Sequence, residues 1–201
     1  MKKLVVILSL VAFNLNAQVS TPKCSSYTEN KKLGQVIFNT VNNYRKSLNE
    51  SPFIWSEYWY ESSLKWNNHL AKNAQWGHRN GPEWLWTNGN ELIVGMTIPN
   101  LDAIDESMYQ YIADSCLQQW IHSPMHHAGL KAPIRTIKQT SCLQDNDGDG
   151  KNEPFSVELC KYGAISVNIN RYSNIKGYSD FTIVQCIMHL GFGIDNTNYI
   201  K

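Results

Sequence analysis

The sequence predicts a single α+β domain, with helices in the first two thirds of the chain and an antiparallel sheet near its end. Apolar residues recur at helical spacing in three stretches before residue 122. After residue 161 the chain changes to β-branched and aromatic runs separated by turn residues, which is typical of adjacent antiparallel strands. Helices first and strands later indicate an α+β layer arrangement.

The N-terminus has the features of an export signal. Lys2 and Lys3 precede an apolar stretch over residues 4–13, and Ala17 ends the small-residue site that a signal peptidase would cut. An apolar core of about ten residues is too short to cross a bilayer, which takes roughly 20, and nothing downstream is longer. We expect residues 1–17 to be removed and the protein to be secreted or periplasmic, with no membrane span.

The mature chain of 184 residues fits one domain, which we place at residues 33–201 after an N-terminal segment of residues 18–32. Without the two lysines of the signal, 16 basic residues face 17 acidic ones, so the formal charge is −1. A nearly neutral chain has no electrostatic footprint for nucleic acid or an anionic membrane. We expect a monomer whose partner is an extracellular ligand or protein.

Two helices are predicted in the first part of the domain. Apolar residues at helical spacing mark residues 33–48, and residues 49–52 stop the pattern. A second helix begins at Ser56, and its apolar stripe runs to Gly77, a natural stop. His78 would therefore stand in the loop that follows this helix.

A loop over residues 81–90 leads to a third helix over residues 104–121. Ser123-Pro124 then predicts a new helix start, because serine is a good N-cap and proline is tolerated at the first helical position. His126 would lie in the first turn of that helix, where the helix dipole disfavours the imidazolium form.

The last elements are predicted to be two strands, over residues 162–170 and 181–188. A stretch containing residues 173–177, with an Asn and a Gly, separates them. They are predicted to pair as antiparallel neighbours joined by a turn.

All five cysteines follow the predicted signal, so an exported chain could form up to two disulfides with one thiol left over. No Cys-x-x-Cys motif is present. The pairing that we favour joins Cys142 and Cys160, because they flank a polar loop rich in turn residues. The alternative is that one or both are buried free thiols.

An acidic insertion near residues 142–160 carries the pattern of a calcium loop, with acids at alternate positions and Gly150 at the sixth. The candidate ligands are Asp145, Asp147, Asp149, Lys151 through its carbonyl group, and Glu153. The twelfth position is Ser156 where an EF-hand has a bidentate glutamate, and no helix pair is expected around the loop. A structural Ca²⁺ site is therefore one interpretation, and a plain acidic turn is the other.

His78, Glu91 and His126 form the main candidate site. Two neutral imidazoles and one carboxylate could hold Zn²⁺ or another divalent cation and leave a position open for water. A hydrogen-bonded cluster that only holds loops in place would use the same residue types. His122 lies four residues before His126, but Pro124 interrupts that spacing and no His-Glu-x-x-His motif is present.

Several short phrases in the chain together match one known family. In chain order they are Asn43-Tyr44-Arg45, Phe53-Ile54-Trp55, the helix from Leu64 to Leu70, His78, the phrase from Glu91 to Gly95, Trp120 followed by Ser123-Pro124-Met125-His126, and the strand from Tyr162 to Val167. This order resembles the bacterial branch of the CAP superfamily, also called SCP domains, over roughly residues 33–190. That superfamily includes cysteine-rich secretory, venom-antigen and plant pathogenesis-related proteins.

The resemblance implies an α-β-α sandwich, with a small antiparallel sheet between helical layers and a cleft lined by histidines and acidic residues. His78 resembles the first cleft histidine, Glu91 the carboxylate of a Gly-Glu-Asn phrase, and His126 the histidine of a Ser-Pro-x-His phrase. The chain departs from the pattern at Asn90 and Leu92, at His127 where arginine is common, and at Ser123 where many eukaryotic members have a second glutamate.

Some members of the family bind divalent cations in this cleft and others bind sterols or lipids elsewhere, and the fold alone implies no catalytic activity. We therefore expect an exported binding protein with a His/Glu cleft for a divalent cation or polar ligand. One alternative is a peptidase-like, metal-dependent hydrolase that uses Glu91 as ligand or base, so enzymatic activity stays open. Another is an interaction module whose aromatic loops, including Trp84 and Trp86, make the contacts.

Overall fold

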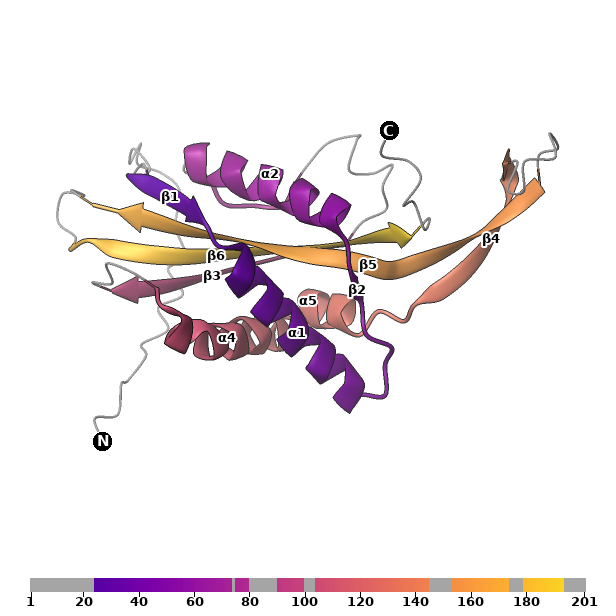
Figure 1. The fold of residues 1–201 in the computed structure, drawn as a ribbon, viewed down its shortest axis with the longest axis horizontal. Helices are drawn as coiled ribbons and strands as arrows, with labels where there is room; N and C mark the ends of the chain where they lie inside the picture. The colour runs from indigo at the N-terminus through magenta and orange to yellow at the C-terminus, as the bar shows by residue number, and fades with distance from the viewer. Residues whose placement is uncertain are drawn as a thin grey trace.

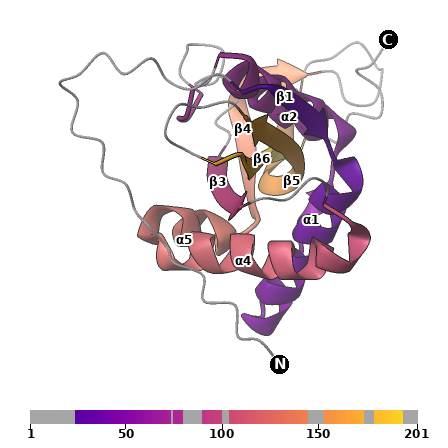
Figure 2. The same ribbon diagram turned by 90° about the vertical axis from the view of Figure 1, so that its left-hand side faces the viewer.

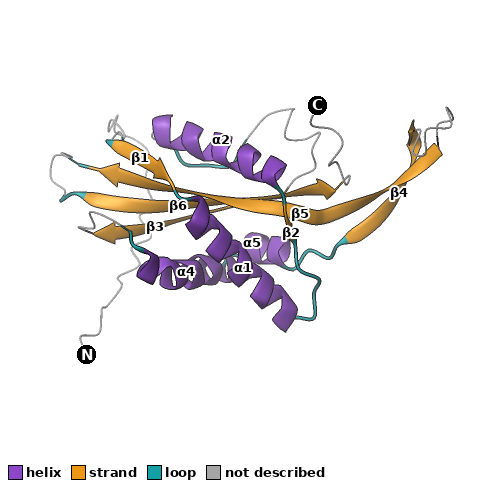
Figure 3. Ribbon diagram, viewed as in Figure 1, coloured by secondary structure: helices purple, strands orange, loops and turns teal. Residues whose placement is uncertain are grey.

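The computed structural model describes residues 24–73, 75–79, 90–99, 104–144, 153–173 and 179–193. Its elements are β1 (Ser26–Glu29), α1 (Lys31–Ser47), β2 (Ile54–Trp55), α2 (Glu57–Asn73), β3 (Asn90–Pro99), the 3₁₀ helix η1 (Glu106–Met108), α4 (Tyr109–His122), α5 (Pro124–Leu130), β4 (Arg135–Gln144), β5 (Glu153–Tyr172) and β6 (Phe181–Gly193). Helices lie on both faces of one sheet (Figures 1 and 3). The predicted α+β class is confirmed.

The sheet is built around the long antiparallel pair β5 and β6. Its main path runs β1-β5-β6-β3, and β2 and β4 also pair with β5. Only β2 is parallel to its neighbour among the pairs that the structure describes. The predicted pairing of the last two strands is confirmed, although both are longer than the apolar runs suggested. The main path ends at β3, which carries Glu91.

Successive residues of the strands point to opposite layers of helices, as the pleat of a strand requires. Ile165 and Val167 join the main core with α1 and α4, while Ala164 packs against Trp59 and Tyr60 of α2. The helix α2 therefore covers one face, and α1, α4 and α5 cover the other (Figure 2).

Asparagine residues mark both ends of the first helix, α1. The Asn30 side chain accepts a hydrogen bond from the Leu33 amide at 2.9 Å, and Asn49, with φ of 61°, follows the helix end. Inside the helix, a Cβ atom on Gly34 would lie 2.4 Å from the carbonyl oxygen of Ile165. Glycine at this position therefore lets α1 approach β5 closely.

The second helix is shorter than the apolar stripe predicted. It ends at Asn73, whose side-chain amide donates to the His69 carbonyl of the last turn at 2.8 Å. Beyond it, the Trp76 ring lies over Gly95 of β3, where a Cβ atom would be 2.6 Å away. The chain thus leaves the helical path before Gly77 and reaches the edge of the sheet at His78.

The short helix α5 is held by a buried arginine. Arg45 of α1 is fully buried; its Nη1 donates to the carbonyls of Leu130 and Ala132, and its Nε donates to Ser51. The guanidinium also lies 3.8 Å from the Phe53 ring centroid. This charged clamp fixes the C-terminal end of α5, and with it the helix that carries His126.

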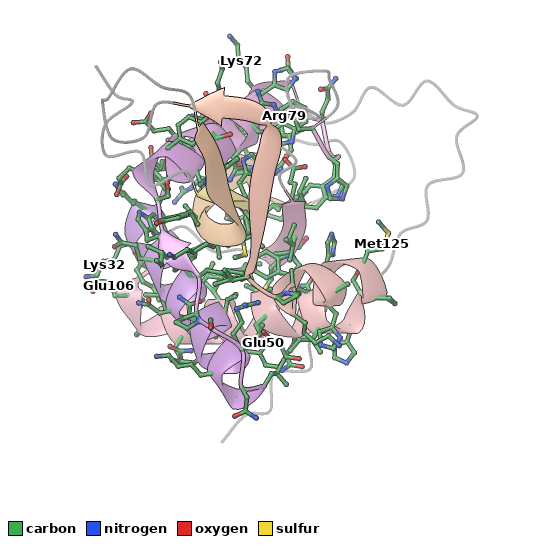
Figure 4. All side chains as sticks on the ribbon, turned by 90° about the vertical axis from the view of Figure 1, so that its right-hand side faces the viewer. Lys32, Glu50, Lys72, Arg79, Glu106 and Met125 are labelled. Atoms are coloured by element: carbon green, nitrogen blue, oxygen red, sulfur yellow. The ribbon has the colours of Figure 1, made fainter. Side chains whose placement is uncertain are left out.

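Ion pairs at the surface add little to this packing. Lys32 of α1 and Glu106 of η1 form an exposed ion pair at 2.6 Å, visible at one side of Figure 4. Such pairs contribute little to stability. In the described part of the chain, no helix has the length and apolar character needed to cross a membrane.

The β4–β5 hairpin extends beyond the helical layers (Figure 1). Its ladder runs from Arg135 paired with Leu159 to Gln144 paired with Glu153, with a register shift between Gln139 and Leu143. Much of the predicted insertion at residues 142–160 is therefore strand, and residues 145–152 at the tip lie outside the described residues.

Candidate functional site

A pocket of about 430 Å³ lies where the two helical layers meet at the edge strand β3. The residues that line it are His78, Glu91, Leu92, Ser123, Met125, His126, Ala128 and Gly129. The structure thus brings the three predicted residues to one place. Glu91 lies on the face of the sheet that α2 covers, whereas His126 belongs to α5 on the opposite face, and His78 lies in the chain that follows α2.

Glu91 is the centre of a hydrogen-bond network. Its side chain is 2% exposed, and its Oε1 accepts from His78 Nδ1 at 3.0 Å and from the Arg79 backbone amide at 2.9 Å. Its Oε2 accepts from His189 Nε2 at 2.7 Å. Burial alone would raise the Glu91 pKa, but the donors from His189, Arg79 and His78 outweigh it and lower the pKa. The carboxylate is therefore ionised at neutral pH.

His189 lies behind Glu91 and is fully buried. Burial lowers its pKa, and the nearby Arg79 charge acts in the same direction against the opposing effect of Glu91. The ring is therefore neutral, with its proton on Nε2 toward Glu91 and Nδ1 free to accept from Ser62 Oγ at 3.2 Å. Arg79 Nη1 reaches the same hydroxyl at 3.4 Å. The network thus continues from Glu91 to α2.

His78 and His126 face each other across the pocket. Their ring centroids are 5.8 Å apart and the ring planes are inclined by 49°. Since His78 Nδ1 donates to the Glu91 carboxylate, the Nε2 atom of a neutral ring keeps its lone pair. Burial, and then the neighbouring His78, lower the His126 pKa. In its neutral form, each of the two rings can therefore offer a nitrogen lone pair to a ligand.

The hydrogen bonds of Glu91 bear on its predicted part in a metal site. The carboxylate already takes three hydrogen bonds, and in the part of the chain that the structure describes no group of three or more His, Cys, Asp or Glu side chains is arranged to hold a metal ion. A carboxylate that orients a histidine through its Nδ1–H is a common support for a metal-binding imidazole. The residues present fit two imidazole ligands supported by Glu91.

The other histidines near the pocket have partners of their own. His127 Nε2 hydrogen-bonds the Tyr44 hydroxyl at 2.7 Å, and His122 Nδ1 lies 2.7 Å from the Gln118 carbonyl. Ser123 occupies the N-cap of α5 as expected, yet its side chain makes no capping hydrogen bond. The capping hydrogen bond that a serine N-cap commonly makes is therefore not observed here.

Sequence reasoning missed His189 and Ser62. His189 lies directly opposite Glu91 in the β3–β6 register, so their side chains share one face of the sheet. This pairing was not predicted because the phrase at Glu91 was not assigned to a strand, and the last strand was ended at Met188. Leu92, Ile93 and Val94 are all buried because both faces of β3 are covered. Such a run lacks the alternation of apolar and polar residues that would identify a strand in the sequence.

The possible calcium loop stays a prediction. Asp145, Asp147, Asp149 and Lys151 lie outside the described residues, and Glu153 is placed only as the first residue of β5. Because Glu153 pairs with Gln144, the described hairpin ends on both sides at the border of the loop.

The favoured disulfide does not fit the hairpin register. Cys142 lies next to Leu143, whose partner is Pro154, and Cys160 lies six positions further along β5 than Pro154. At the rise of an extended strand, the two cysteines are roughly 16–20 Å apart. A disulfide needs Cα atoms within about 7 Å, so Cys142 and Cys160 cannot be bridged in this register.

Comparison with known proteins gives one distant likeness. No family model and no curated protein matches the chain. An outer surface protein from Borrelia burgdorferi matches in structure with a TM-score of 0.44 and 11% sequence identity, over 83% of this chain and 96% of that chain. A likeness at this level assigns no family.

Proposed function

We propose that this chain is an exported protein of the CAP superfamily whose pocket binds a divalent cation, with His78 and His126 as ligands. The observation that carries the proposal is the hydrogen bond from His78 Nδ1 to buried Glu91, which leaves the Nε2 atom of His78 available to a ligand. The ring centroids of His78 and His126 are 5.8 Å apart. Neutral imidazole is the preferred nitrogen ligand of Zn²⁺. Polar groups of a ligand would take the remaining coordination positions.

The family proposal rests on the order of the sequence phrases and on the layers around the sheet. A CAP-type sandwich would have an antiparallel sheet between helices and a cleft histidine after the second long helix. Here helices flank the sheet on both faces and His78 follows α2, while His126 lies in the first turn of α5 after Ser123-Pro124. Export rests on the predicted signal at residues 1–17.

Binding is favoured over hydrolysis by the position of Glu91. A general base must reach the proton that it removes, and a carboxylate that is 2% exposed and already accepts three hydrogen bonds is poorly placed to do so. We assign Glu91 the role of orienting His78, and we assign no catalytic residue.

Zinc titration of the metal-free protein by calorimetry tests the proposal. We expect one site in the wild type, and a loss of affinity of about tenfold or more in His78→Ala and in His126→Ala, because each removes one ligand. His122→Ala is a matched control, since His122 is exposed and contacts the Gln118 carbonyl of its own helix. Absence of zinc binding, or equal affinity in His126→Ala, would overturn the cation site.

A further inference from the structure

Two buried thiols face each other in the core, away from the pocket. Cys116 of α4 and Cys186 of β6 are both fully buried, and their Sγ atoms lie 3.4 Å apart. Among the cysteines whose side chains the structure describes, this is the only pair in contact. Cys24, the third, points its thiol at the carbonyls of Ser26 and Arg171 near the start of the sheet.

Both residues of the pair belong to the main hydrophobic core. Cys116 lies on the buried stripe of α4 between Ile112 and Trp120, and Cys186 is paired in register with Val94 of β3 and Val167 of β5. Each sulfur is therefore the natural partner of the other.

We propose that Cys116 and Cys186 form a disulfide when the exported chain folds in an oxidising compartment. The sulfurs would close from 3.4 Å to the bond length of about 2.05 Å, a movement that small side-chain rotations can supply in place. The proposal assigns a cross-link between α4 and the middle of the sheet, and it is independent of any ligand in the pocket.

The chemistry needs an oxidant, and a small-molecule disulfide such as oxidised glutathione supplies it. The thiolate of one cysteine attacks oxidised glutathione, forming a mixed disulfide and releasing one glutathione thiolate. The thiolate of the second cysteine attacks the protein sulfur of that mixed disulfide, forming the Cys116–Cys186 bond and releasing the second glutathione. Two cysteine protons and two electrons end on two molecules of reduced glutathione.

The bond must form before the core closes. In the folded reduced protein the hydrogen bond with Cys116 and complete burial raise the Cys186 pKa well above its usual range, so little thiolate is present. Thiolate is the attacking species, and the same burial would protect the finished bond from reductants. Folding with the oxidant present should therefore oxidise the pair, whereas adding it after reduced folding should act slowly.

The test is to fold the mature chain with oxidised glutathione, unfold it without reductant, alkylate free thiols and map the peptides by mass spectrometry. We expect Cys116 and Cys186 to escape alkylation and their two peptides to be linked, with a mass about 2 Da below that of the separate thiols. Alkylation of both residues, or a link from either of them to another cysteine, would overturn the proposal.

Thermal melting gives a second readout. Wild type folded under reducing conditions should melt about 4–16 °C below wild type folded with oxidised glutathione, because the bond closes a loop across 70 positions. The Cys24→Ser variant should behave in the same way, since Cys24 lies outside the pair. If oxidised and reduced wild type melt at the same temperature, the bond is not formed; this comparison needs no substitution in the core.

Discussion

Glu91 shows how one buried charge can organise a site. Its carboxylate takes donors from a loop histidine, a loop backbone amide and a strand histidine. Each donor comes from a different part of the chain, so the charge fixes their relative positions. The pocket therefore depends on Glu91 even if no ligand touches it.

Substituting Glu91→Gln should damage both folding and binding. The amide keeps the shape but replaces one acceptor oxygen with a donor, which leaves a buried donor facing a donor and costs about 1–3 kcal/mol of stability. Zinc affinity should fall by about 10–100-fold because His78 loses its orientation. Urea unfolding and calorimetry measure the two effects.

The control for this variant is Glu61→Gln on the exposed face of α2. Both measured quantities should stay at the wild-type value there. Unchanged zinc affinity in Glu91→Gln would refute its orienting role.

Stability should decline as the pH falls below about 6.5. Burial lowers the folded-state pKa of His189 and of His126 below 6.5, so the unfolded chain binds more protons than the folded one in this range. The neutral rings thus contribute stability above pH 6.5, and it is lost as the pH drops through their folded pKa values. Ionised Glu91, whose folded pKa is also lowered, adds a further loss below about pH 4.5.

Urea midpoints measured from pH 8 to pH 5 test this dependence. Each histidine changes the free energy of unfolding by at most about 1.4 kcal/mol per pH unit, and fully buried His189 contributes the larger share. His189→Gln should flatten the curve, whereas His122→Ala should leave its slope as in the wild type. A His189→Gln curve parallel to the wild type would contradict the assignment.

At the scale of elements, the helices were predictable and half of the sheet was not. α1 and α4 follow apolar spacing, and the start of α5 follows from Pro124 in the first turn; these signals act locally. β1 and β2 are short strands of four and two residues that exist because β5 is beside them. β3 is covered on both faces, so its apolar run reads as neither helix nor alternating strand.

The difference between local signals and contacts of distant segments also explains which site residues were predicted. His78, Glu91 and His126 were found from local phrases and from the family resemblance those phrases carry. His189 needs the β3–β6 register, and a register is set by contacts between distant segments. The predicted Cys142–Cys160 disulfide does not fit the hairpin register for a related reason, because residues that flank a loop in the sequence lie close in space only where the register aligns them.

Gly34→Ala tests the packing of α1 on the sheet. Alanine normally stabilises a helix interior by about 0.5–1 kcal/mol over glycine. Here the new methyl group would lie 2.4 Å from the Ile165 carbonyl oxygen, so the helix must move away and we expect a net loss of about 1–3 kcal/mol. Asn43→Ala, at an exposed position of the same helix, should change the urea midpoint little; a stabilised Gly34→Ala would contradict the close approach.

At the scale of the whole molecule, two helical layers share one sheet and the pocket lies at their common border. α2 supports Glu91 through Ser62 and His189, while α1 holds α5 through Arg45. The distance between His78 and His126 therefore depends on how both layers sit on β3. Changes in either layer should reach the pocket.

A calcium titration tests the predicted loop site, most of whose ligands lie outside the described residues. If the acidic loop binds Ca²⁺ with a dissociation constant of roughly 0.1–1 mM, 10 mM calcium should raise Tm by about 3–10 °C. The double variant Asp147→Asn/Asp149→Asn should lose this increase. Equal melting temperatures of the wild type in calcium and in chelator would exclude the site.

The position of β3 at the end of the sheet's main path has a consequence for solubility. An edge strand presents unpaired backbone groups that can recruit a strand from another molecule, and proteins commonly cover or interrupt such edges. Here His78 and α5 flank this border, and a cation between His78 and His126 would bridge it. Loss of the bridge would then show first as self-association of folded molecules through β3, before any loss of the fold itself.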